Sequence, residues 1–330
     1  MKINLTLATL LMTLCAVALA SGPDYKIVDT IKIGGAAKWD YLYMDSAAHR
    51  LYVTHGTQTE VVDTVSDKVV GTITNTEGVH GVAIARDLGI GFTSNGASNT
   101  VGVFDLDTLK NKTSINVGTK PDAIVYDPAT HKVLTFNGKS NNVSIIDATT
   151  LKVIATLAVA GKPEFSVVAG DGNVYFNIED TGQLASIDPR TNKLHKPVSL
   201  KPCEEPTGLA VDDKLNLYSV CSNNLMTITS TAGKSIGGAK IGSGPDGVAF
   251  LDGYALSANG EDGTLTAVGL VDGKFVPVAT IQTQSGARTI TVDPATHRVY
   301  LPTADFAPTA KGEKRVSVPD SFHVLVLQQQ

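Results

Sequence analysis

The chain has 330 residues, of which 42% are hydrophobic, with 27 Lys and Arg against 32 Asp and Glu and a formal net charge of −5. This mildly acidic balance argues against a general polyanion-binding protein, although it leaves room for a local basic patch. The length is large for a single core, but closed β structures routinely exceed the usual domain size.

The first twenty residues have the pattern of a secretory signal. A positive start at Lys2 precedes a largely apolar run from Leu5 to Leu19, and Ala18-Leu19-Ala20 fits a signal-peptidase site. The run is shorter than the ~20 residues that cross a bilayer, and no later apolar span is long enough. We therefore expect residues 1–20 to be cleaved near Ala20 and residues 21–330 to form a periplasmic or secreted domain without a transmembrane segment.

The stretch from Gly118 to Gly161 predicts four short strands, at 122–127, 132–136, 143–147 and 153–159. β-branched and aromatic residues fill these runs, and Asn, Asp, Gly and Pro separate them at hairpin spacing. The opening of this unit recurs along the chain at intervals of 39 to 43 residues, starting at Asp40, His80, Asp122, Glu164, Thr207, Asp246 and Arg288. Four strands in each repeat of this length are typical of a propeller blade, so the sequence predicts an all-β, seven-bladed β-propeller with four-stranded antiparallel blades.

The last repeat has only three predicted strands, the third of them at 322–327. The strand-like segment 25–33 precedes the first repeat and can supply the fourth. We expect this amino-terminal strand to complete the carboxy-terminal blade and close the ring, which removes the exposed sheet edges that an open array would leave.

Cys203 and Cys221 are the only cysteines after residue 20. An exported chain with an even pair of cysteines favours a disulfide. The two residues also fall at the same end of one predicted hairpin in the fifth repeat, so we expect them to be bonded.

The predicted ring brings two sets of polar residues to one face. The repeat starts gather at the mouth of the central channel, and the loops between second and third strands surround them. Asn-Gly pairs in these loops are also ordinary hairpin formers, and lysines near the acids can simply pair with them. The candidate ligand-binding residues are Trp39, Asp40, His55, His80, Asp122, Asn137, Glu164, Glu179, Asp246, Asn259, Arg288 and Asp305. The opposite face carries turn residues such as His131 and His297, which occupy identical Asp-Pro-Ala-Thr-His turns and indicate an architectural role.

Carboxylates converging on one axis suit a hard divalent cation such as calcium, and the predicted ligands are Asp122, Glu164 and Asp246. Trp39 occupies the place that a proline holds in four other repeats, where it can stack on a ligand at the rim, plug the channel or pack against Tyr41. The loop 306–320 carries Lys311, Lys314 and Arg315, which favours either contact with an anionic ligand or a solvated loop.

The motifs LYVTHG, TVGVFDLDTLK, PDAIVYDPATHKVL and HRVYLPTADF resemble the YncE-like, YVTN-type β-propeller family over residues 25–328. The resemblance implies an exported seven-bladed propeller. One branch of the family is associated with single-stranded DNA, but an acidic mouth with one tryptophan argues against a nucleic-acid partner here. Related propellers include lactonases, whose metal is held by Glu, Asp and Asn, and subunits of redox dehydrogenases.

We therefore predict a monomeric, non-catalytic binding or scaffold protein that engages a small molecule, ion or protein at the channel mouth. The alternatives are a metal-dependent hydrolase of the lactonase type and an accessory subunit of a periplasmic redox enzyme. Nothing in the sequence specifies a nucleophile beside a base, so the prediction leans away from an enzyme.

Overall fold

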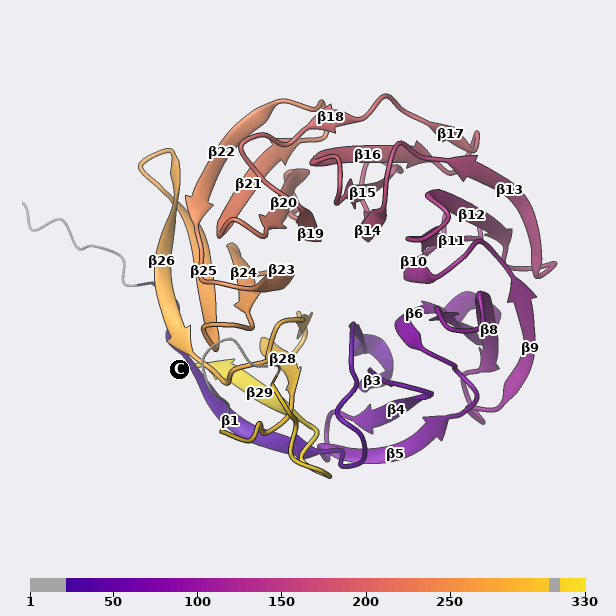
Figure 1. The fold of residues 1–330 in the computed structure, drawn as a ribbon, viewed down its shortest axis with the longest axis horizontal. Helices are drawn as coiled ribbons and strands as arrows, with labels where there is room; N and C mark the ends of the chain where they lie inside the picture. The colour runs from indigo at the N-terminus through magenta and orange to yellow at the C-terminus, as the bar shows by residue number, and fades with distance from the viewer. Residues whose placement is uncertain (1–21, 309–314) are drawn as a thin grey trace, which may run out of the picture.

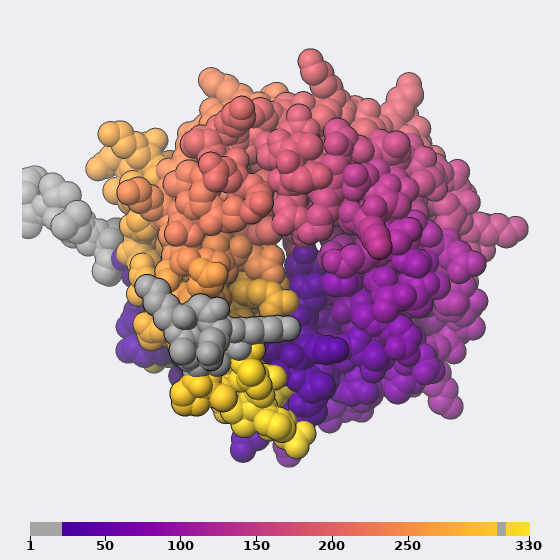
Figure 2. Space-filling model, in the orientation of Figure 1, coloured from indigo at the N-terminus to yellow at the C-terminus, as the bar shows by residue number. Residues whose placement is uncertain are grey.

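The computed structural model describes residues 22–308 and 315–330, and it shows seven sheets arranged around one axis (Figure 1). The predicted seven-bladed propeller is confirmed. The predicted signal segment, Lys311 and Lys314 lie outside the described residues. Figure 2 shows that side chains fill the ring apart from a narrow opening near its centre. None of the helices in the described part of the chain has the length and hydropathy needed to span a membrane.

The blades are numbered here in chain order, each from its inner to its outer strand. Blade 1 contains β2 (Leu42–Asp45), β3 (Arg50–His55), β4 (Gln58–Asp63) and β5 (Lys68–Ile73), and blade 2 contains β6 (Val79–Ala85), β7 (Ile90–Asn95), β8 (Thr100–Asp105) and β9 (Asn111–Asn116). Blade 3 contains β10 (Pro121–Asp127), β11 (Lys132–Asn137), β12 (Asn142–Asp147) and β13 (Lys152–Ala158). Short 3-10 helices, η1 (Ser46–Ala48) and η2 (Arg86–Leu88), lie in the first hairpins of blades 1 and 2.

Blade 4 contains β14 (Pro163–Val168), β15 (Val174–Ile178) and β16 (Gln183–Asp188), and its outer strand is split into β17 (Lys193–Leu194) and β18 (Val198–Ser199). Blade 5 contains β19 (Pro206–Val211), β20 (Asn216–Cys221), β21 (Leu225–Ser230) and β22 (Ser235–Lys240). Blade 6 contains β23 (Pro245–Leu251), β24 (Tyr254–Asn259), β25 (Thr264–Val271) and β26 (Lys274–Gln282). Blade 7 contains β27 (Thr291–Asp293), β28 (Arg298–Thr303), β29 (His323–Gln329) and β1 (Tyr25–Lys32).

The cores lie between neighbouring blades, which explains why a single repeat cannot stand alone. Phe136 on β11 and Phe176 on β15 are fully buried, with ring centroids 4.9 Å apart across the interface of blades 3 and 4. Alternating inward residues on both faces of each sheet supply these contacts, so every blade depends on its neighbours for burial.

The amino-terminal strand closes the ring as predicted. β1 pairs antiparallel with β29, from Tyr25 opposite Gln329 to Lys32 opposite His323. Tyr25 and Ile31 are each 2% exposed and join the cores on the two sides of blade 7.

The predicted disulfide joins Cys203 to Cys221, with Cα atoms 5.4 Å apart. Cys221 ends β20 and Cys203 lies just before β19, so the bond ties the first hairpin of blade 5 at one end.

Replacing both cysteines by alanine is expected to lower the free energy of unfolding by about 2–3 kcal/mol, because the bond restricts a loop of 18 residues in the unfolded chain. Guanidinium unfolding of the oxidised wild type and of the double variant measures this difference. Equal midpoints for the two proteins would contradict the expectation.

Candidate functional site

The residues at the repeat starts reach the mouth because of a shared irregularity in the inner strands. In blades 2 to 6 the inner strand opens with Val79 or a proline, and the next residue is His80, Asp122, Glu164, Thr207 or Asp246. The pairing register with the second strand shifts at this point in all five blades. Bulges of this kind re-aim a side chain out of the sheet. Asp40 and Arg288 hold the equivalent places just before β2 and β27.

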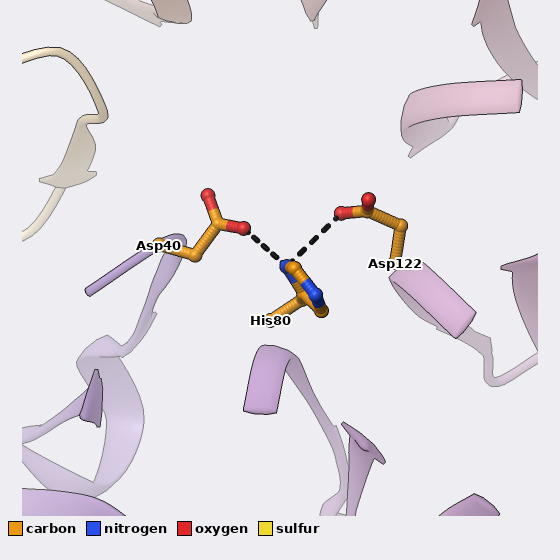
Figure 3. Close-up of side chains that lie close together, drawn as sticks. All are labelled: Asp40, His80 and Asp122. Atoms are coloured by element: carbon orange, nitrogen blue, oxygen red, sulfur yellow. Dashed lines mark hydrogen bonds and ion pairs between the residues drawn. The ribbon is translucent and has the colours of Figure 1, made fainter. Parts of the chain in front are cut away.

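Asp40, His80 and Asp122, from blades 1, 2 and 3, converge at the mouth (Figure 3). His80 Nδ1 lies 2.5 Å from Asp40 Oδ2 and 3.5 Å from Asp122 Oδ1. Burial alone would lower the pKa of His80, but its hydrogen bond with Asp40 and the charge of Asp122 raise that pKa above its ordinary value. Burial, followed by the charge of Asp40, raises the pKa of Asp122 to about 6.

Glu164 lies at the next position around the ring and is paired. Lys162 Nζ is 2.6 Å from Glu164 Oε1 and also contacts Glu179. Tyr41 donates a hydrogen bond from its hydroxyl to Glu164 Oε2 at 3.3 Å. Burial, followed by the charge of Asp122, raises the pKa of Glu164 to about 8. Lys162 therefore pairs with nearby acids, as the sequence allowed for the lysines near the repeat starts.

Arg288 links the last blade to its neighbours. Its Nε donates to Asp246 Oδ2 at 2.9 Å, and its Nη2 donates to the backbone carbonyl of Trp39 at 2.9 Å. The guanidinium carbon lies 5.4 Å from the centre of the Trp39 ring. Asp246 is thus held by a cation from blade 7, and burial raises its pKa.

A cavity of about 1000 Å³ opens beside these residues. Its lining includes Trp39, Asp40, His80, Arg288, Phe306 and Arg315. Trp39 stacks on Phe322, with ring centroids 5.4 Å apart and an interplanar angle of 14°, and it also approaches Phe306. Trp39 therefore packs inside the protein on one side and still borders the cavity.

The channel below the mouth is apolar. Tyr41 and Phe165 meet edge to face, with ring centroids 4.8 Å apart. The equivalent positions in the other blades hold only Gly81, Ala123, Gly208, Gly247 and Thr289. A second cavity of about 410 Å³ borders Tyr41 and is lined largely by inner-strand aliphatic residues. The charged groups are thus confined to the mouth. Tyr41 and Phe165 were not among the predicted site residues, although two aromatic residues among small ones at equivalent repeat positions are a signal visible in the sequence.

Eight predicted site residues do not line the mouth cavity. Four of them belong to the ion pairs described above, namely Asp122, Glu164, Glu179 and Asp246, and the other four are His55, Asn137, Asn259 and Asp305. Asn137 and Asn259 are fully buried, and their amides donate to hydroxyl groups of their own blades. His55 Nε2 lies 2.6 Å from the carbonyl of Ala36, and Asp305 accepts from Gln284. The side chains of Asn137 and Asn259 thus hydrogen-bond within their own blades, which is compatible with the hairpin role that Asn-Gly pairs allow.

The predicted metal ligands Asp122, Glu164 and Asp246 are not grouped together in the structure. Glu164 is engaged by Lys162 and Asp246 by Arg288. In the described ranges, the one group of three ligand-bearing residues with mutually close atoms is Asp40, His80 and Asp122, whose ligand atoms all lie within 4.8 Å of one another. Asp122 is common to both sets.

No family model and no curated protein matches this chain, so membership of the YncE-like family stays a prediction. Solved structures do match. A chain from the hydrazine synthase of Kuenenia stuttgartiensis aligns with a TM-score of 0.69 and 16% identity, covering 83% of this chain and 94% of that one. The structure of U3-55K (TM-score 0.77, 8% identity) covers 92% of this chain and 99% of its own. The crystal structure of the RRP9 WD40 repeats aligns with a TM-score of 0.77 and 7% identity, covering 92% of this chain and 98% of that one. These likenesses show the fold alone.

Proposed function

We propose that this protein is an exported binding protein that takes a small organic acid at the channel mouth. The observation that carries the proposal is the cavity of about 1000 Å³ beside Arg288 and Arg315. Its size suits a small molecule, and guanidinium groups match the planar geometry of a carboxylate. The rings of Trp39 and Phe306 border the same space and offer apolar faces to the rest of such a ligand.

Arg315 supports the anionic character of the ligand. Its guanidinium lies 5.9 Å from the ring centre of Phe306, and its Nη1 donates to Ser285 Oγ at 2.5 Å. It donates at longer distance to the carbonyls of Gly260 and Glu261, at 3.5 and 3.4 Å. In the part of the chain that the structure describes, no carboxylate forms an ion pair with Arg315. A guanidinium so placed beside a cavity retains the capacity to bind an acid.

Trp39, the only tryptophan of the chain, provides the assay. We expect benzoate to change Trp39 emission saturably and the uncharged analogue benzamide to have little effect. Arg288→Gln and Arg315→Gln should each weaken benzoate binding at least about tenfold, the loss expected for a charge-assisted hydrogen bond. Arg190→Gln is the matched control, because Arg190 lies in an exposed turn and pairs with Asp188. Equal responses to benzoate and benzamide, or no loss in either mouth variant, would contradict the proposal.

Export is a separate part of the proposal, supported by the signal pattern of residues 1–20. Mass spectrometry of the full-length gene product expressed in a Gram-negative host should find a periplasmic chain that begins near Ser21. A cytoplasmic chain that retains Met1 would count against export and leave the binding assay unaffected.

A second candidate is a metal-assisted hydrolase of the lactonase type. The observation that favours it is His80 between two carboxylates, because a carboxylate beside a bound cation can activate water. Zinc-dependent hydrolysis of γ-butyrolactone that is lost in Asp122→Asn would support this candidate. The third alternative, an accessory redox subunit, has only the fold likeness to the hydrazine synthase chain, and co-purification of a coloured partner would support it.

A further inference from the structure

We infer that Asp40, His80 and Asp122 form a binding site for one divalent cation of the zinc and manganese class. The three residues come from the inner edges of consecutive blades, and their ligand atoms lie within 4.8 Å of one another. Figure 3 shows both carboxylates directed at the same ring nitrogen of His80. Binding of a cation at these three residues does not require the organic acid proposed above, which would be bound by Arg288 and Arg315.

The burial of the Asp122 carboxylate, without a hydrogen-bond donor among the described residues, supports the site independently of the distances within the cluster. Its residue is only 5% exposed, and its carboxylate accepts no hydrogen bond from any residue of 22–308 or 315–330. Buried carboxylates almost always have donors, because an uncompensated buried charge is costly. The carboxylate is directed toward Asp40 and His80 (Figure 3), and its one ion-pair contact within the described part of the chain is with His80 Nδ1 at 3.5 Å. A cation at that point would give it a closer partner than the imidazole.

Lys120 and Lys162 act on Asp122 only through their charge, which lowers its pKa, and among the described residues neither of them forms an ion pair with it. Lys162 is engaged by Glu164 and Glu179, and Arg288 by Asp246. Arg288 also approaches Asp40, at 3.9 Å. His80 alone stands between Asp40 and Asp122, so the three residues carry an excess of negative charge that favours a divalent ion.

The donor set indicates the class of ion. Calcium takes six to eight oxygen ligands, whereas imidazole nitrogen suits zinc and other transition metals, and carboxylates bind these ions as well. One imidazole and two carboxylates therefore point away from the predicted calcium. Three protein ligands also leave coordination positions for water or a ligand, and Asp40 and His80 line the mouth cavity where such a ligand would enter.

Gly96 positions the imidazole. A Cβ atom at Gly96 would lie 2.8 Å from both Cδ2 and Nε2 of His80, closer than such contacts allow. The ring therefore lies against the turn between β7 and β8, on the side away from the two carboxylates. Gly96→Ala is expected to move the ring without removing a ligand, and a shift of this kind typically weakens metal binding about 10–100-fold.

The test is calorimetric titration of the chelator-stripped mature protein with ZnCl2, MnCl2 and CaCl2. We expect one equivalent of Zn²⁺ to bind, with Ca²⁺ at least about 100-fold weaker. Asp122→Asn and His80→Gln should each reduce Zn²⁺ affinity at least about tenfold, and Gly96→Ala should do so while both carboxylates remain. His131→Gln is the control, because His131 lies in an exposed turn on the other face beside Asp87.

Circular dichroism of each variant establishes that it is folded before its affinity is compared. Wild-type protein loaded with Co²⁺ gives a readout that needs no variant, since coordination by nitrogen and oxygen produces visible d–d absorption that Zn²⁺ displaces. The inference is overturned if the wild type binds no Zn²⁺, or if folded Asp122→Asn binds it as tightly as the wild type. Benzoate binding measured in chelator reports on the organic-acid site separately, so the two proposals can fail independently.

Discussion

Deletion of residues 22–33, which contain β1, is expected to leave the protein without a cooperatively folded ring. β1 supplies the outer strand of blade 7 and pairs with β29 along its whole length. Its loss would expose the β29 edge and the cores that Tyr25 and Ile31 fill. Re-exposing these two side chains alone costs about 3–6 kcal/mol, a large share of the about 5–15 kcal/mol that stabilises a typical domain.

Near-UV circular dichroism and thermal unfolding measure this effect. The deleted chain should lose its near-UV signal and its single sharp transition, and the unpaired β29 edge should promote association in size-exclusion chromatography. Val28→Thr is the matched control, because Val28 lies on β1 with its side chain 45% exposed. A monomeric deleted chain with an unchanged melting temperature would show that ring closure does not depend on β1.

Asp122→Asn is expected to stabilise the chelator-stripped protein at pH 8 by on the order of 1–3 kcal/mol while it weakens zinc binding at least about tenfold. The pKa of Asp122 is raised from its ordinary 3.8 to about 6, first by burial and then by the charge of Asp40. Each pKa unit corresponds to 1.36 kcal/mol between the two protonation states, so the ionised side chain destabilises the fold. Asparagine keeps the shape without the charge, and His80 keeps its hydrogen bond with Asp40.

The sign of the pH dependence follows from linkage. Between about pH 4 and pH 6 the folded protein holds a proton on Asp122 that the unfolded chain has released, so the contribution of Asp122 to stability falls as pH rises through this window. Urea unfolding from pH 4 to pH 8 should show that the advantage of the Asn variant appears across this window and then stays constant. A variant less stable than the wild type at pH 8 would contradict this account of Asp122.

A single substitution that raises stability and weakens metal binding would fit a site in which a buried acid has only a long contact within the described ranges, with His80 at 3.5 Å. Binding sites commonly hold groups that are unfavourable for folding alone, and a ligand repays the cost when it binds. Glu164 differs from Asp122, because Lys162 gives its carboxylate a close cationic partner.

Most of the fold could be predicted because the same four-strand pattern recurs along the chain every 39 to 43 residues. The strands predicted at 132–136 and 143–147 differ by one residue at an end from β11 and β12, since turn residues mark their limits. The closure by β1 follows from counting strands in the last repeat, and the disulfide from two cysteines at one end of a hairpin.

The candidate site could be predicted only in part. The repeat places Asp40, His80 and Asp122 at equivalent points around one axis, so their presence at the mouth follows from the closed ring. Which of them meet depends on side-chain directions across blades, and these are set by the bulges at the inner-strand starts. Asn137 illustrates the limit, because its hydrogen bonds to Asn142 and Ser144 draw it into its own blade although its loop faces the mouth.

Crystals soaked in ZnCl2 and measured on both sides of the zinc absorption edge test the metal centre most directly. We expect one anomalous peak near the ring axis, about 2.0–2.2 Å from Nδ1 of His80 and from a carboxylate oxygen of Asp40 and of Asp122. Density with no peak there, and with His80 still hydrogen-bonded to Asp40, would show that these three side chains do not form a cation site.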